Sequence, residues 1–307
     1  MILVTAALGI IGREAIDELN RMGVPTRALI PNEHKRAELD AWFDERRLDR
    51  RLLDIAVGDL ADPASLGPAL EGVERAVIIY PALNADVSMV EAFAAAAAGR
   101  ELQHVVHLSA IGASREAPTR LGRLFGTCEQ IVAGLGVPYT HLQPHMFLLM
   151  QNIRSFAEEI QNQQVLRLPL GRGRSTWIDA RDISAAIARV VVGAGTGQTH
   201  VLTGPEALSG VDIVEMLGRT AGYRLRFEDL EPEVARKRML AAKMQPWLVE
   251  DSLVMFEAFR AGVAAGVSPT LRQLIGNEGR RFNQFAYEYA WAFRKGEVEG
   301  QLSGWLN

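Results

Sequence analysis

The first twelve residues constrain the fold of this chain more than any other stretch. Residues 2–4, Ile-Leu-Val, are typical of a strand buried in a parallel sheet, and Gly9 and Gly12 follow where such a strand would turn into a helix. In nucleotide-binding α/β units this turn lets the backbone approach a pyrophosphate, and the helix N-terminus supplies N–H donors. Ala6 occupies the position of the first glycine in a Gly-x-x-Gly-x-x-Gly pattern. Because a Cβ atom at a positive φ costs about 1 kcal/mol, we expect Ala6 to weaken pyrophosphate binding rather than abolish it.

Short apolar runs alternate with helical patterns through the first half of the chain. The runs are residues 2–5, 26–30, 55–57, 76–80 and 105–109, the helical stretches are 13–22, 35–46, 64–70, 87–98 and 121–135, and 138–142 follows as a sixth strand. This alternation predicts an α/β fold with a Rossmann-type doubly wound parallel sheet.

After about residue 150 the alternation blurs and helical patterns dominate. We therefore predict a Rossmann domain over residues 1–150 and a smaller, mostly helical C-terminal domain over 151–307, with part of 175–205 returning to the first sheet. Residues 200–203 read as a late strand. The aromatic residues between 282 and 293 favour packing or a subunit interface over a cofactor box, and a homodimer is one outcome of that pattern.

Composition excludes several function classes. The net charge of −4 gives no electrostatic case for a nucleic-acid or membrane partner, and no uncharged apolar run approaches the length of a membrane span. The lone Cys128 excludes an intramolecular disulfide and suits a reducing compartment. With no leader pattern before the first strand, we expect a cytoplasmic protein. The six histidines are scattered, and no Cys/His spacing predicts a metal site.

Several blocks of sequence occur in a fixed order along residues 1–230. They are Val-Thr-Ala-Ala-Leu-Gly-Ile-Ile-Gly at 4–12, Arg-Ala-Leu-Ile at 27–30, Gly-Asp-Leu at 58–60, Val-His-Leu-Ser-Ala at 106–110, Glu129 with Gly-Val-Pro-Tyr-Thr at 136–140, and the later blocks 147–152, 177–183 and 203–209. In this order they resemble the NmrA-like family of atypical short-chain dehydrogenase/reductases. The resemblance implies an NADP(H)-binding Rossmann domain, a small second domain and a substrate cleft between them. The family includes quinone and enone reductases, dye reductases and redox-sensing regulators.

The resemblance also implies a set of cofactor contacts. These are Thr5, Ala6, Leu8, Gly9, Ile10, Ile11 and Gly12 in the phosphate turn, Arg27, Asn32, Lys35 and Arg36 around the second strand, Asp59 and Leu60 at the adenine, Tyr80 and Pro81 near the nicotinamide ribose, and Ser109. Pro31 stands where the family has an arginine for the 2′-phosphate. Since residues 30–32 also lack the acid of an NAD site, we predict NADP(H) over NAD(H).

The usual proton-transfer devices are missing. No tyrosine has a lysine four residues later, and the stretch 121–135 contains no lysine. Candidate catalytic residues are therefore His145, expected to face the substrate cleft, together with His107 and Ser109, which share one face of the fifth strand. The alternative for each histidine is a hydrogen-bonded structural residue, and this alternative is favoured for His107. A quinone-like acceptor would need no strong acid.

We predict an NADPH-dependent reductase of a quinone, enone or similar aromatic small molecule by direct hydride transfer. The apolar run 146–150 and the later aromatic residues would line its cleft. Two alternatives stay open: an NADP(H)-sensing regulatory protein, and a drifted reductase fold that performs a non-redox step.

Overall fold

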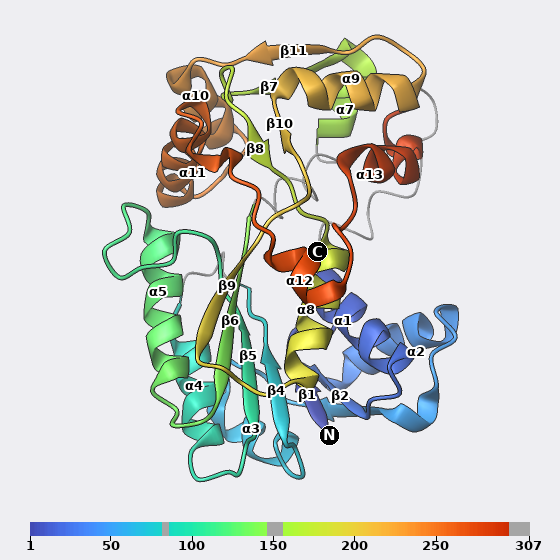
Figure 1. Cartoon of the computed structure of the whole chain (residues 1–307), viewed down its shortest axis with the longest axis vertical. Coiled ribbons are helices and arrows are strands. Elements are labelled where there is room, and N and C mark those ends of the chain that lie inside the picture. Colours follow the sequence, from blue (N-terminus) through green and yellow to red (C-terminus); the bar gives the residue numbers. More distant parts are fainter. Residues whose placement is uncertain (82–85, 146–155, 295–307) are drawn as a thin grey trace. The chain divides into compact units, whose positions relative to one another are not determined.

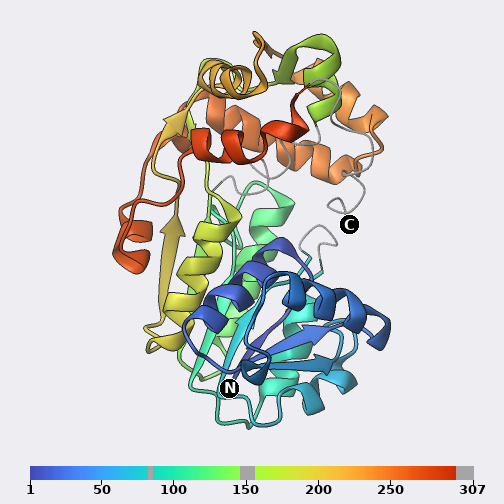
Figure 2. The same cartoon turned by 90° about the vertical axis from the view of Figure 1, so that its right-hand side faces the viewer.

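The computed structural model describes residues 1–81, 86–145 and 156–294. It divides the chain into two compact units (Figures 1 and 2). The first unit comprises Met1–Pro144, Ala180–Leu202 and Thr270–Asn277, and the second comprises the described parts of 145–179, 203–269 and 278–307. The stretch 180–202 belongs to the first unit and adds a strand to its sheet. The segment 270–277 is helical and belongs to the first unit as well, which no sequence pattern indicated. Among the described residues, no helix is long and apolar enough to cross a lipid bilayer.

The first unit consists of parallel strands joined by helices. Its strands are β1 (Ile2–Val4), β2 (Thr26–Ile30), β3 (Leu53–Val57), β4 (Arg75–Ile78), β5 (His104–Leu108), β6 (Tyr139–Pro144) and β9 (Gln198–Leu202), and its helices are α1 (Ile10–Arg21), η1 (Glu33–Lys35), α2 (Arg36–Glu45), η2 (Arg50–Leu52), α3 (Pro63–Ala69), α4 (Ser88–Ala97), α5 (Arg120–Ala133), α8 (Ala180–Val192) and α12 (Thr270–Ile275). The strands form one sheet in the order β3-β2-β1-β4-β5-β6-β9.

Every strand pair in this sheet is parallel, and the strand order reverses between β1 and β4. Helices α1 and α8 pack side by side on one face, while α3, α4 and α5 follow one another on the other (Figure 1). The predicted Rossmann-type doubly wound sheet is therefore confirmed. Because all the strands run the same way, their carboxyl ends lie along one edge, and that edge positions the candidate site.

Local sequence explains where these elements begin. The Asp62 carboxylate caps α3 by accepting a hydrogen bond from the Ala64 N–H at 3.2 Å, and Pro63 occupies the first turn. The Thr119 hydroxyl caps α5 in the same way through the Gly122 N–H. Helix α1 begins at Ile10, directly after Gly9 and three residues before the predicted start.

The second unit packs helices around two short strand pairs. Its elements are α7 (Ala157–Gln163), β7 (Val165–Leu168), β8 (Ser175–Thr176), β10 (Ala207–Leu208), α9 (Gly210–Ala221), β11 (Arg226–Asp229), α10 (Pro232–Ala241), α11 (Pro246–Arg260), η5 (Val263–Ala265), α13 (Phe282–Glu288) and η6 (Ala290–Ala292). Strand β7 pairs with β11 in parallel, and β8 pairs with β10 antiparallel. The unit is mostly helical, as predicted.

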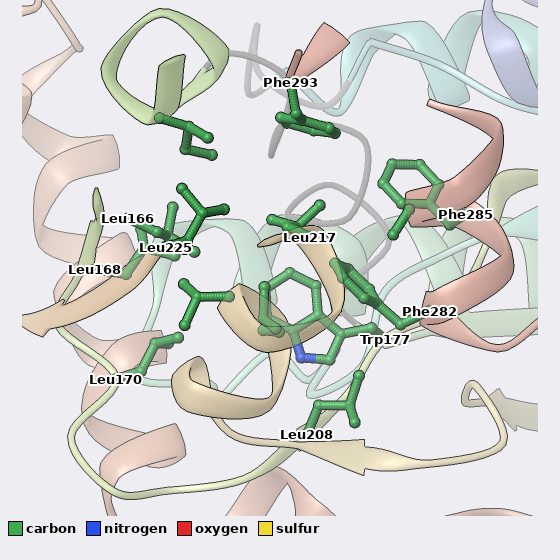
Figure 3. Close-up of a cluster of buried hydrophobic side chains, with 14 of the residues drawn as sticks. Leu166, Leu168, Leu170, Trp177, Leu208, Leu217, Leu225, Phe282, Phe285 and Phe293 are labelled. Atoms are coloured by element: carbon green, nitrogen blue, oxygen red, sulfur yellow. The ribbon is translucent and has the colours of Figure 1, made fainter. Parts of the chain in front are cut away.

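The late aromatic residues form the core of the second unit. Phe282, Phe285 and Phe293 are buried with Trp177 among leucines of β7 and α9 (Figure 3). The Tyr287 side chain, by contrast, is 75% exposed. The packing role predicted for the cluster is confirmed. The expectation that these aromatics line a substrate cleft is wrong for the three phenylalanines, because their rings are enclosed by the core of their own unit.

Candidate functional site

Thr5 locks the sheet at the point where its strand order reverses. The buried Thr5 hydroxyl donates to the Ile79 carbonyl oxygen at 2.6 Å and accepts from the Ile79 N–H at 2.7 Å. These bonds tie the residue after β1 to the residue after β4. In doubly wound sheets, ligands bind outside the carboxyl ends of the strands at this reversal. The structure therefore places Thr5 beneath the edge where a dinucleotide would lie.

The turn after β1 leaves the start of α1 open to an anion. Ala6 has a positive φ of 48°, and its carbonyl oxygen accepts a hydrogen bond from the Gly9 N–H at 2.9 Å. Gly9 is the N-cap of α1 and provides no side-chain cap, and the first turn holds no acidic residue. Among the described residues no side chain caps the first N–H groups of α1, so they can bind a ligand, and the helix dipole favours a negative one. These residues fit the pyrophosphate of a dinucleotide.

The two glycines of this turn differ in how much space surrounds them. A Cβ atom on Gly12 would lie 2.3 Å from the Ala6 carbonyl oxygen, whereas one on Gly9 would lie 3.3 Å from it. Only a glycine at position 12 therefore allows α1 to pack against the turn. Position 9 has room for a small side chain. Leu8 and Ile10 are half-buried beside Gly9, while the Ile11 side chain is buried in the core.

The end of β2 brings basic side chains to the same edge. Asn32 is exposed, and the Lys35 ammonium donates to a Glu38 carboxylate oxygen at 2.9 Å. Arg36 pairs with Glu33 one turn earlier. Both pairs are largely exposed, so each contributes little to stability and can rearrange around a ligand.

Arg27 does not join this group. Its Nε donates to Asp54 at 2.7 Å, and its Nη1 donates to the carbonyl oxygens of Ala69 and Glu71 at 2.9 and 2.7 Å. It also lies three residues before the end of β2. The implied cofactor contact for Arg27 is therefore replaced by a structural one, in which its guanidinium joins β2, β3 and the end of α3.

The loop after β3 is ordered by its own hydrogen bonds. The Asp59 N–H donates to the Ser65 hydroxyl at 2.9 Å, and the Asp59 carboxylate accepts from the Ala61 N–H at 2.9 Å. The Leu60 side chain is buried in the core under α3. Asp59 thus lies at the carboxyl edge, and Leu60 contributes packing beneath it.

A row of buried polar groups crosses the sheet under α5. The Nε2 atom of His107 lies 3.2 Å from the Tyr80 hydroxyl, and its Nδ1 atom lies 3.2 Å from Nδ1 of His141. Burial lowers the pKa values of both histidines and raises that of Tyr80. The expectation that His107 is a catalytic residue is wrong, because its side chain is fully enclosed and burial keeps its pKa well below the usual histidine value. Pro81, next to Tyr80, is exposed.

Ser109 is held at the end of β5 by Glu129, a residue for which the sequence pattern predicts no role. Its hydroxyl donates to Oε1 of Glu129 at 2.5 Å, and the Gln143 amide donates to the same oxygen at 2.8 Å. Glu129 stands on α5, ten residues before the Tyr139-Thr140 pair of the same sequence block. The carboxylate therefore fixes two polar side chains of adjacent strands.

His145 lies inside the second unit. Its Nδ1 atom is hydrogen-bonded to the Thr176 hydroxyl, its ring contacts Phe259, and burial lowers its pKa to about 4. The expectation that His145 presents a proton to a cleft is corrected by this enclosure, since its side chain is buried and neutral. The apolar run 146–150 falls outside the described residues.

Known proteins resemble this chain over nearly its whole length. The family model of the NmrA-like family matches residues 1–276. An NAD(P)H azoreductase from Xenophilus azovorans is 33% identical over 95% of this chain and 99% of its own, and a (4-alkanoyl-5-oxo-2,5-dihydrofuran-3-yl)methyl phosphate reductase from Streptomyces griseus is 34% identical over 95% and 99%.

Solved structures show the same fold. The NADPH complex of the quinone oxidoreductase QOR2 from Escherichia coli superimposes with a TM-score of 0.81 at 22% identity, covering 94% of this chain and 99% of the other. The triphenylmethane reductase of Citrobacter sp. in complex with NADP(H) gives 0.75 at 18% identity, with 94% and 99% covered. The family model and the full-length relatives agree with the turn between β1 and α1. The chain therefore belongs to the NmrA-like family.

Proposed function

We propose that this chain is an NADPH-dependent reductase that transfers hydride to a quinone-like or other conjugated aromatic small molecule. The observation that carries the proposal is the uncapped N-terminus of α1 at the β1–β4 reversal, in a chain one third identical to a named NAD(P)H azoreductase. The names of a quinone oxidoreductase and a dye reductase with the same fold support the same substrate class. The preference for NADPH is supported by Lys35 and by the absence of an acidic residue at 30–32.

Residues of the first unit would bind the cofactor. Thr5 and the turn at Ala6 position the first N–H groups of α1 for a pyrophosphate. Tyr80 and Ser109 follow β4 and β5, at the same carboxyl edge of the sheet. When bound, NADPH supplies a hydride, which carries two electrons. His107 and His145 are buried and neutral, so the proton that completes reduction of a quinone to a hydroquinone comes from water. A quinone accepts hydride without a strong general acid, so a site that only positions it against the nicotinamide would suffice.

The test combines binding with turnover. NADPH and NADH are titrated calorimetrically, and their oxidation is followed by absorbance with a panel of quinones, enones and azo dyes. We expect saturable NADPH binding and turnover with part of the panel. Binding without any turnover would overturn the reductase and leave the redox-sensing alternative, and no binding of either nucleotide would overturn both.

Gly9→Asp provides a matched variant. Aspartate is a favourable N-cap and its Cβ meets only the Ala6 oxygen at 3.3 Å, so the fold should keep its stability. The new carboxylate would compete with the pyrophosphate for the N–H groups of α1 and repel it, so NADPH binding should weaken at least about tenfold. Unchanged NADPH binding in this variant would place the dinucleotide elsewhere.

A further inference from the structure

Arg13 is the first charged residue after the phosphate turn, and its guanidinium is held in place. It follows Gly12 in α1, donates from Nη2 to Oε1 of Glu38 at 2.6 Å, and lies over the Trp42 ring with 5.8 Å between its Cζ atom and the ring centroid. Its side chain is only 25% exposed. No sequence block assigns a role to this arginine, although a cation directly after Gly12 is visible in the sequence.

Glu38 joins Arg13 to Lys35. Its second carboxylate oxygen accepts from the Lys35 ammonium at 2.9 Å, and the hydrogen bond from Lys35 lowers the Glu38 pKa. One carboxylate thus holds two cations that come from different elements, α1 and η1. The three groups carry a net charge of +1 at the end of β2, where a Rossmann fold binds the adenosine ribose.

Arg13 and Lys35 have more hydrogen-bond donors than their bonds to Glu38 use. The Nε atom of Arg13 is buried and has no hydrogen-bond partner among the described residues. A guanidinium carries five N–H groups and an ammonium three, so the bonds to Glu38 use only part of the supply. Because the Nε atom is buried, the donors that a ligand oxygen could reach are the remaining N–H groups of the partly exposed Arg13 guanidinium and of the Lys35 ammonium.

We infer that Arg13, together with Lys35, binds the 2′-phosphate of NADPH and sets the preference for NADPH over NADH. The inference rests on the proposed function. Pro31 cannot bind a phosphate through its side chain, so the cation needed at this subsite has to come from another element. Arg13 supplies it with the planar fork that suits a phosphate, and Trp42 and Glu38 hold that fork in place before the ligand arrives.

The experiment measures dissociation constants for NADPH, NADH and 2′,5′-ADP in the full chain and in variants. Arg13→Gln should weaken NADPH and 2′,5′-ADP about tenfold or more while changing NADH less than about twofold, because only the first two carry the 2′-phosphate. Arg13→Lys keeps the charge without the fork and should fall between. Arg46→Gln is the matched control, since Arg46 lies over the same Trp42 ring at 5.8 Å but pairs with Glu14 and Asp17.

Distinct outcomes separate this inference from the function on which it rests. If Arg13→Gln weakens NADPH and NADH equally, or if Arg46→Gln gives the same selective loss, the assignment of Arg13 is overturned while the reductase stands. A parent chain that binds NADH as tightly as NADPH overturns it too. If the parent chain binds neither nucleotide, the proposed function fails first. Thermal unfolding of each variant shows whether a lost affinity reflects a lost fold.

Discussion

Ala6 holds a backbone conformation that its own side chain disfavours. Its φ of 48° lies in the left-handed region, where a Cβ atom costs about 1–2 kcal/mol. The conformation is retained because the Ala6 carbonyl must meet the Gly9 N–H and pass close to Gly12. Strain of this kind is often found at ligand sites, and here it lies beneath the expected pyrophosphate.

Replacing Ala6 by glycine should relieve this strain. The gain is partly offset by the greater freedom of glycine in the unfolded chain, so Ala6→Gly should leave the free energy of unfolding unchanged or raise it by up to about 1 kcal/mol. NADPH binding should tighten, because the backbone can approach the pyrophosphate more closely. Urea unfolding and calorimetric titration measure the two effects.

The neighbouring Ala7 supplies the control. Its methyl group is fully buried and its φ is not positive, so Ala7→Gly should lower the free energy of unfolding by about 1 kcal/mol. If Ala6→Gly destabilises the fold as much as Ala7→Gly does, residue 6 is not strained in solution.

At the scale of the element, α1 depends on how closely it approaches the turn before it. Gly12→Ala would place a Cβ atom 2.3 Å from a backbone oxygen and 2.9 Å from a backbone carbon of Ala6, and neither can move without shifting the helix. We expect a loss of about 1–3 kcal/mol of stability and weaker NADPH binding. Gly9→Ala meets a single atom at 3.3 Å and keeps an ordinary φ of −74°, so it should cost less than about 1 kcal/mol.

Urea unfolding of the two variants side by side checks this difference. Equal losses would mean that both glycines serve only as flexible turn residues. In that case the position of α1 would be set by its other contacts, such as the hydrogen bond that the Ser184 hydroxyl of α8 donates to the Ile11 carbonyl at 3.0 Å.

The same scale shows what local sequence could predict. Strand β2 lies at residues 26–30 as predicted, because Thr26 and the apolar residues 28–30 stand between two prolines, Pro25 and Pro31, that limit the strand at both ends. The pairs β7–β11 and β8–β10 were missed, because they are short and their partners lie far apart in the chain. Helix α12 packs against α8 in the first unit, and nothing in its own residues indicates which unit it joins.

Some features of the candidate site could likewise be predicted from local sequence, and others could not. The turn after β1 is a local pattern of two glycines after an apolar strand, so its position could be predicted from sequence. Strand periodicity correctly put His107 and Ser109 on one face, but their depth depends on α5 and on the register that sets His107 opposite His141. Arg13 and Glu129 act through partners on other elements, Glu38 for the first and Ser109 with Gln143 for the second, so neither pairing is visible in one segment.

At the scale of the whole molecule, both units hold neutral histidines inside their cores. His104, His107 and His141 are enclosed in the first unit and His145 in the second, and burial lowers the pKa of each. Below the unfolded value near 6.5, the unfolded chain therefore binds more protons than the folded one. The free energy of unfolding should fall as the pH drops from about 6.5, with His145 contributing down to its folded pKa of about 4.

The contribution of His145 can be isolated. Asparagine can keep a hydrogen bond to Thr176 and does not titrate, so His145→Asn should reduce the stability lost between pH 7.5 and pH 5 by about 2 kcal/mol, whatever its stability at pH 7.5. His34→Gln, at an exposed position, should follow the parent chain. Urea unfolding at both pH values measures these losses. If all three proteins lose stability in parallel, His145 is not buried as a neutral ring, and the acid sensitivity has to come from the carboxylates or from the first unit alone.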